Sequence, residues 1–181
     1  MRYIFLDLET TGLEAGADQI TEAAWITDDQ FGRPVVRQFF VEHDRLPNRW
    51  VLENTDYLTR IALAPKTPLQ DVLVALHEDC ARVPGIPAYL VGACIAFDDR
   101  HLRSAYKRLW GEAEPPYHYH VIDIEAMAFG LLGLSDMPSL KVLREKLGIA
   151  GENPAAHTAL ADAQEVRLIF DAIRDKGVPH D

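Results

Sequence analysis

The chain has 181 residues, of which 48% are hydrophobic and 25% are charged, and we expect one domain that covers residues 1–181. The 18 Lys and Arg residues against 28 Asp and Glu residues give a net charge of −10. This charge argues against a protein that wraps long duplex nucleic acid, although it is compatible with a site that grips only the end of a strand.

Neither a secretory signal peptide nor a membrane helix is expected. The N-terminal apolar run is short and contains Asp7 and Glu9, and no stretch approaches the length of a membrane-spanning helix. Cys80 and Cys94 are the only cysteines, and their spacing is not that of a metal site. Two unpaired thiols are typical of a reducing compartment, so we expect a cytoplasmic protein.

The first predicted element is a buried strand at residues 3–6 that leads directly into two acids, Asp7 and Glu9. Because side chains alternate along a strand, both carboxylates point to the same side. Two carboxylates so close together repel each other and lose hydration unless a cation lies between them. Residues 10–12 follow as a turn whose backbone can approach a ligand. Taken alone, an Asp-x-Glu pattern more often marks a solvated strand end than a metal site.

The middle of the chain alternates between predicted strands and helices. Apolar runs bounded by turn residues predict three further strands, at residues 19–27, 35–41 and 89–91. Short connections imply that the first three strands of the chain form an antiparallel meander. Residues 43–68 contain three prolines and a candidate short helix at 55–62, so we expect mainly irregular structure, which often carries function beside a site. A helix is predicted over residues 69–83.

A second helix is predicted from about residue 98 to residue 110. Its inward stripe consists of Leu102, Ala105, Tyr106, Leu109 and Trp110. Asp98 is in phase with this stripe and is a candidate ligand, although a helix N-cap is an equally good interpretation. Asp99 lies four residues before Arg103 and suits a surface ion pair. Arg100, Arg103 and Lys107 share an outward face, which favours a solvated surface over a phosphate-binding strip.

Residues 119–122 predict a further strand. His118 and His120 share one face of this segment, but no further ligand is at hand, so a metal role is the weaker interpretation. Asp123 is expected to cap the next helix, with Glu125 in its first turn. This second Asp-x-Glu pattern is therefore interpreted as structural.

The last two helices are predicted to begin at Pro138 and at residue 157. The first of them ends at Gly148, and the second runs to about residue 176. The buried face of the final helix consists of Ala159, Val166, Ile169 and Ile173. Asp162 falls in phase with that face. A carboxylate on the apolar stripe of a helix needs a cation or strong hydrogen-bond donors.

Three motifs occur along the chain in a recognisable order: Asp7-x-Glu9 on the first strand, Phe97-Asp98 at the start of a middle helix, and His157-x4-Asp162 at the start of the last helix. In order and rough spacing they resemble the motifs of the DEDDh family of 3′–5′ exonucleases, and the resemblance spans nearly the whole chain. It implies an α/β, ribonuclease-H-like fold. In that fold a five-stranded mixed sheet, with its first three strands antiparallel, carries helices on both faces.

The four acids also point to metal chemistry on physical grounds. Four carboxylates that converge on one point cannot all stay ionised without cations. Two divalent cations about 4 Å apart would also stabilise the attacking and leaving oxygens of a phosphodiester. Oxygen ligands suit Mg²⁺ or Mn²⁺ rather than zinc.

The resemblance assigns roles to individual residues of this site. It implies that Asp7 bridges both metals, that Glu9 and Asp162 hold the metal that activates water, and that Asp98 serves the other metal. It also implies that His157 takes the proton from that water, which suits a side chain whose ordinary pKa lies near neutrality.

The resemblance further implies five residues at the 3′-terminal nucleotide: Thr10, Thr11, Gly12, Leu13 and Phe97. Leu13 would wedge the last two bases apart, and Phe97 would contact the terminal sugar or base. Many family members carry His-Asn where this chain has Ala93 and Cys94. That departure bears on terminal-nucleotide binding and hence on substrate preference.

We therefore expect a metal-dependent 3′–5′ exonuclease that hydrolyses phosphodiester bonds at the 3′ end of single-stranded DNA or RNA and releases nucleoside 5′-monophosphates. A single-stranded end reaches such a site without unpairing. Two alternatives stay open: a non-catalytic module that binds nucleic-acid ends or proteins on the same fold, and a phosphodiesterase that acts on dinucleotides. The expected partners are single-stranded 3′ ends and no membrane. A homodimer and a polymerase partner both stay open.

Overall fold

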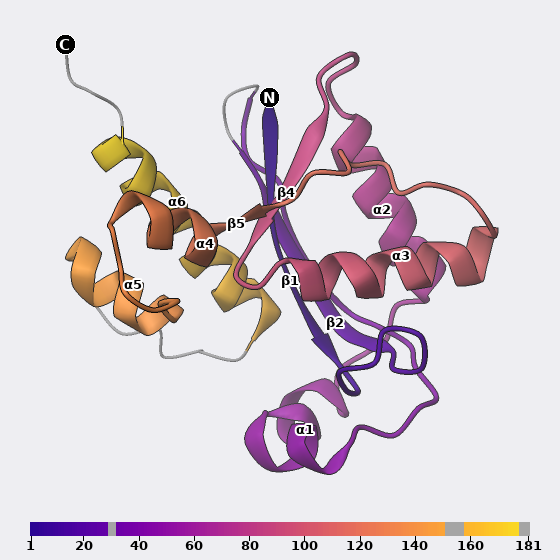
Figure 1. Cartoon of the computed structure of the whole chain (residues 1–181). Coiled ribbons are helices and arrows are strands. Elements are labelled where there is room, and N and C mark those ends of the chain that lie inside the picture. Colours follow the sequence, from indigo (N-terminus) through magenta and orange to yellow (C-terminus); the bar gives the residue numbers. More distant parts are fainter. Residues whose placement is uncertain (29–31, 151–157, 178–181) are drawn as a thin grey trace.

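The computed structural model of the chain describes residues 1–28, 32–150 and 158–177. Its centre is a five-stranded sheet in the order β3-β2-β1-β4-β5 (Figure 1). The strands are β1 (Arg2–Thr10), β2 (Ile20–Thr27), β3 (Val36–Phe40), β4 (Ala88–Gly92) and β5 (Ile122–Asp123). β1, β2 and β3 pair antiparallel, whereas β4 runs parallel to β1 and β5 runs parallel to β4. The predicted mixed sheet with an antiparallel first half is confirmed.

Helices cover both faces of this sheet, as predicted. They are α1 (Arg49–Asn54), the short π-helical segment η1 (Tyr57–Ile61), α2 (Leu69–Ala81), α3 (Ala96–Trp110), α4 (Ile124–Leu131), α5 (Leu140–Leu147) and α6 (Ala159–Gly177). In Figure 1, α2 and α3 lie on one side of the sheet, α4, α5 and α6 lie on the other, and α1 lies beyond the lower end of the strands. None of the helices in the described part of the chain is long and apolar enough to cross a membrane.

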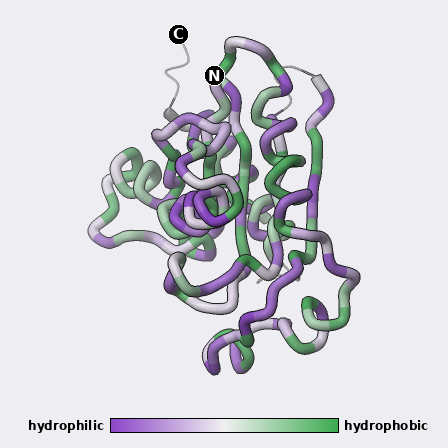
Figure 2. Tube along the Cα trace, turned by 90° about the vertical axis from the view of Figure 1, so that its right-hand side faces the viewer, coloured by the Kyte–Doolittle hydropathy of each residue, from purple (hydrophilic) through white to green (hydrophobic). Residues whose placement is uncertain are grey.

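β1 separates two apolar cores because its side chains alternate between the faces of the sheet. Ile4, Leu6 and Leu8 pack into the core beneath α2 and α3. Phe5 packs into the other core, where its ring lies 5.3 Å from that of Phe170 on α6. Asp7 and Glu9 lie on the same side of the strand as Phe5, so both carboxylates point toward α6. Figure 2 shows hydrophobic stretches along the strands in the middle of the molecule.

Residues 43–68 are mainly irregular, as predicted, and contain the short segments α1 and η1. Asn48 is the N-cap of α1, and its side chain accepts a hydrogen bond from the backbone N–H of Val51. Val51, Tyr57 and Ile61 are buried together as a small apolar cluster. The candidate short helix at residues 55–62 corresponds to η1, whereas α1 was not predicted. The cap and this cluster stabilise the two helical segments between the prolines.

Other boundaries differ from the predicted ones. No strand forms at residues 119–121, because β5 contains only Ile122 and Asp123, and the imidazole Nδ1 of His118 accepts the N–H of His120. Such local bonding competes with strand pairing. Pro138 precedes the N-cap Ser139 and is outside α5. Leu109 and Trp110 were predicted to face inward but are 37% and 38% exposed, at the end of α3.

The predicted cap of α4 and the predicted inward face of α6 are confirmed. Asp123 caps α4 by accepting the N–H groups of Glu125 and Ala126. The apolar stripe of α6 is fully buried, as its members Ala159, Val166, Ile169 and Ile173 show. Because α6 packs on β1 and β2, its first turn lies beside the acids of β1.

Candidate active site

Three carboxylates from two distant parts of the chain converge beside the sheet. Asp7 and Glu9 come from β1, and Asp162 comes from the first turn of α6. Each offers one oxygen atom, and the three oxygens lie within 4.8 Å of one another. The alternation of β1 and the helical phase of α6 explain this convergence, because both predict side chains that point into the layer between these two elements. Three oxygen ligands so placed fit a divalent cation.

Asp98 adds a fourth carboxylate from the first turn of α3. Its side chain is buried, and Oδ1 accepts a hydrogen bond from the backbone N–H of Leu8 at 3.0 Å. The N-cap of α3 is Ile95, so the N-cap interpretation of Asp98 is wrong. Asp99 instead pairs with Arg103 on the helix surface, as predicted.

The four acids strongly perturb one another. Burial raises the pKa of Asp7 well above its usual value, and the negative charges of Asp98, Asp162 and Glu9 raise it further. Burial also raises the pKa of Asp98, although a backbone hydrogen bond acts in the opposite direction. Burial, then the negative charges of Glu22 and Asp162, raise the pKa of Glu9 to about 8. Carboxyl groups in such a cluster need a positive charge between them to remain ionised at neutral pH.

A groove of about 470 Å³ opens beside these acids. Asp7, Glu9 and Asp98 lie in its wall. Four of the five residues predicted to hold substrate also line it, namely Thr10, Gly12, Leu13 and Phe97. The side chain of Leu13 is 71% exposed, so it is free to contact a ligand.

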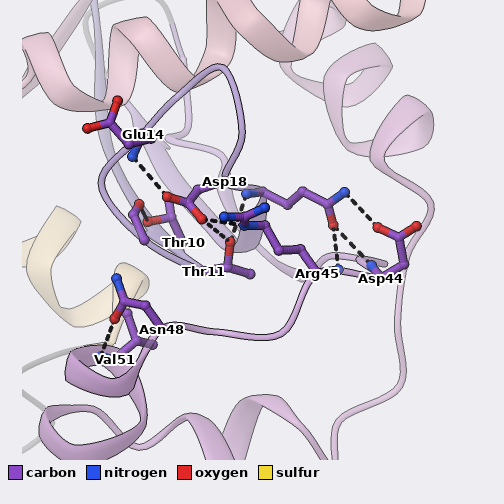
Figure 3. A network of polar contacts seen from close by, with 10 residues as sticks. Thr10, Thr11, Glu14, Asp18, Asp44, Arg45, Asn48 and Val51 are labelled. Carbon is purple, nitrogen blue, oxygen red and sulfur yellow. Dashed lines mark hydrogen bonds and ion pairs between the residues drawn. The ribbon is translucent and has the colours of Figure 1, made fainter.

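Thr11, the fifth of these residues, faces away from the groove. It is fully buried, and its hydroxyl donates to Asp18 Oδ1 at 3.1 Å (Figure 3). Asp18 Oδ2 also accepts the backbone N–H of Glu14, and the backbone oxygen of Thr11 accepts the N–H of Asn48. A Cβ atom at Gly12 would lie 2.5 Å from Asp18 Oδ2, so only glycine fits there. Thr11 therefore braces the loop that presents its neighbours to the groove.

His157 lies outside the described residues, so its prediction rests on the sequence alone. Conversely, sequence reasoning missed the α1 side of the groove. That side consists of Asn48, Trp50, Val51 and Thr55. The signal for these residues was available, because Asn48 is a favoured N-cap residue that directly follows Pro47. Trp50 is 63% exposed although it is one of the largest apolar side chains.

Comparisons with known proteins agree with this fold. The exonuclease family model, RNase_T, matches residues 4–170. Among solved structures, the chain is similar to E. coli exonuclease I in complex with a dT13 oligonucleotide (21% identity, TM-score 0.68). It is also similar to exonuclease I from the moderately thermophilic Methylocaldum szegediense (22%, 0.72) and to a zinc-bound complex of the E. coli enzyme with single-stranded DNA (20%, 0.72).

Each of these three alignments covers 97% of this chain but 41% of the other chain. The chain therefore spans less than half the length of the exonuclease I structures that it matches. A comparison with curated proteins found no match. The structural likeness confirms the predicted fold class.

Proposed function

Because the chain belongs to the exonuclease family, we propose that residues 1–181 form one exonuclease domain that removes nucleotides from the 3′ end of single-stranded nucleic acid. The reaction is hydrolysis of the terminal phosphodiester, it depends on divalent cations, and it releases nucleoside 5′-monophosphates. DNA, RNA or both are substrates.

The convergence of Asp7, Glu9 and Asp162 carries this proposal, since their oxygens lie within 4.8 Å of one another and two of the three acids, Asp7 and Glu9, line the groove. When bound there, two Mg²⁺ or Mn²⁺ ions would neutralise the acids and stabilise the charge that develops on the attacking and leaving oxygens. The donor set fits these ions because it consists of carboxylate oxygens. Asp7 would hold both ions, Glu9 and Asp162 would hold one, and Asp98 would hold the other.

The chain's own residues supply the remaining steps. His157, five residues before Asp162, would accept the proton of the attacking water. Asp98 stays fixed because the Leu8 N–H holds its carboxylate. Thr10 is held as well, since its hydroxyl donates to the backbone oxygen of Gly12 at 2.6 Å. This hydrogen bond stabilises the turn beside Glu9 that would contact the terminal nucleotide.

The walls of the groove suit a single strand. Leu13 and Trp50 are exposed apolar side chains at the groove, and Phe97 adds a partly buried ring. Unpaired bases stack on such surfaces without regard to sequence. Arg100 is the only Lys or Arg among the described groove residues, and it would contact a backbone phosphate. The similar E. coli exonuclease I structures hold single-stranded DNA, which supports a single-stranded substrate for this chain.

The test is digestion of DNA and RNA oligomers that carry a label at the 5′ end or at the 3′ end. With Mn²⁺ or Mg²⁺, the 5′-labelled strand should shorten in single-nucleotide steps, while a 3′ label should appear at once as a mononucleotide. EDTA should stop both reactions. A labelled dinucleotide in the same assay separates the two alternatives. Cleavage of the dinucleotide alone indicates the small-substrate phosphodiesterase, and binding without cleavage indicates the non-catalytic module.

A further inference from the structure

A fifth carboxylate, that of Glu22, lies beside the four acids of the site. Glu22 is fully buried on β2, and it is directly opposite Glu9 in the pairing of β1 with β2. Opposite residues of an antiparallel pair have Cβ atoms only about 5 Å apart, so two acids in these positions destabilise the sheet. Buried acids are almost never left without a partner. Glu22 therefore needs a cationic partner that does not also pair with the carboxylate of Glu9.

Both carboxylate oxygens of Glu22 are held by other parts of the fold. Oε1 accepts a hydrogen bond from Gln38 Nε2 on β3 at 2.7 Å. Oε2 pairs with Arg60 Nη1 at 2.6 Å. The guanidinium of Arg60 lies over the Phe40 ring, with Cζ 5.6 Å from the centroid. These contacts fix the direction of the Arg60 side chain.

Arg60 belongs to η1, and π-helical turns are rare elements that often occur at functional sites. Because Arg60 pairs with Glu22 at 2.6 Å and Glu22 lies directly opposite Glu9, the positive charge of Arg60 also lies near Glu9. Yet Glu9 makes no ion pair with any residue in the described ranges of the chain. A guanidinium that paired with Glu9 would occupy the oxygens that a cation needs.

We propose that Glu22 is a positioning residue of the metal site. Glu22 binds Arg60, so that the guanidinium does not pair with the carboxylate of Glu9. Glu22 and Arg60 together add no net charge to the cluster. The pair therefore leaves the site negative enough to bind divalent cations, and it keeps Glu9 available to them. This inference rests on the proposed metal-dependent function.

The test compares the dissociation constants for Mn²⁺, measured by calorimetry on the purified chain, for wild type, Glu22→Gln and the double variant Glu22→Gln/Arg60→Met. In Glu22→Gln, Arg60 loses its ion pair with Glu22 and its guanidinium can pair with Glu9, so Mn²⁺ affinity should fall roughly 10-fold or more, as for other partners that orient metal ligands. The double variant removes the competing cation and should regain most of the wild-type affinity. A residue with a merely structural role would give a double variant as weak as the single one.

Asp79→Asn is the matched control, because Asp79 is also a buried acid that pairs with an arginine, at 3.1 Å from Arg37 Nε. It lies on α2, on the other side of the sheet, so its substitution should lower the melting temperature without changing Mn²⁺ affinity. If Glu22→Gln does not fold, the double variant still tests the proposal. A 10-fold loss of Mn²⁺ affinity in the double variant would overturn it. Wild-type affinity in Glu22→Gln would also overturn it. Absence of Mn²⁺ binding to the wild-type chain would instead overturn the proposed function.

Discussion

The carboxylate of Asp98 and the backbone N–H of Leu8 form a 3.0 Å hydrogen bond across 90 residues of sequence. Leu8 lies between Asp7 and Glu9, so this bond fixes the first turn of α3 against the segment of β1 that carries two of the acids. The same side chain therefore has two roles that substitutions can separate. One role needs only a hydrogen-bond acceptor, and the other needs a negative charge.

Asp98→Asn should keep the acceptor and lose the charge, whereas Asp98→Ala loses both. We expect Asp98→Asn to fold with nearly wild-type stability but to lose most exonuclease activity. Asp98→Ala should be less stable than Asp98→Asn by about 1–3 kcal/mol, since it leaves the buried Leu8 N–H without its acceptor. Urea denaturation and the oligomer assay measure these effects. Equal stability of the two variants would contradict the role of the hydrogen bond.

The acid cluster should make the metal-free chain less stable as pH rises. The pKa values of Asp7, Asp98 and Glu9 are raised in the folded chain, so the folded state binds protons more tightly than the unfolded state. Stability is then highest near the unfolded values around 4 and declines up to about 8, the folded value for Glu9. Asp7→Asn should reduce this decline and stabilise the metal-free chain at pH 8 by about 1–2 kcal/mol.

Melting temperatures in EDTA between pH 5 and pH 8 test this expectation. The exposed Glu53 on α1 provides the control, since Glu53→Gln should follow the wild-type profile. Adding Mn²⁺ should restore most of the lost stability to wild type but not to Asp7→Asn. A wild-type chain that gains stability from pH 5 to pH 8 in EDTA would show that repulsion among the carboxylates does not destabilise the folded state.

Arg100 should bind a phosphate of the substrate, whereas Lys107 on the same helix should not. Arg100 lines the groove, while Lys107 pairs with Glu112 at 3.4 Å. Loss of one phosphate contact should weaken binding of a single strand and lower the slope of log affinity against log salt by about 0.7. Fluorescence anisotropy of a labelled oligomer at several salt concentrations measures this slope for Arg100→Ala and Lys107→Ala. Identical slopes for the two variants would show that Arg100 does not contact a phosphate of the substrate.

Cys94 is held in a left-handed backbone conformation, with φ +48°. Ordinary side chains are strained there, whereas asparagine tolerates this region. Cys94→Asn should therefore stabilise the chain, by at most the cost of about 1–2 kcal/mol that an ordinary side chain pays in this region. Ala93→Asn, at a neighbouring position without positive φ, should give no gain. Chemical denaturation of both variants checks the prediction, and a less stable Cys94→Asn variant would contradict it.

Local patterns in the sequence were sufficient to find the four acids. Alternation on β1 places Asp7 and Glu9 on one side of the strand, and helical phase places Asp98 and Asp162 on buried faces. These patterns depend only on neighbouring residues, so they could be interpreted without knowledge of the fold. The resemblance to a known family then indicated which elements come together.

Features that depend on long-range contacts could not be predicted in this way. The position of Glu22 opposite Glu9 follows from the register of β1 and β2, which contains an irregularity at Glu9 and Thr10. A charged residue within an apolar strand was a visible signal, but its partner Arg60 is 38 residues away. The helical turn of α1 was likewise not predicted, because its buried residue Val51 packs in a cluster with Tyr57, Ile61 and Phe40 of β3.

The central claim is that Asp7, Glu9 and Asp162 bind a divalent cation that the reaction needs. A crystal soaked with Mn²⁺, measured at a wavelength where manganese scatters anomalously, tests this claim most directly. We expect an anomalous peak between these three carboxylates, within about 2.0–2.5 Å of their oxygens, and no such peak in Asp7→Asn. A chain that hydrolyses the 3′ end in the presence of Mn²⁺ but shows its only anomalous peaks elsewhere would contradict the account.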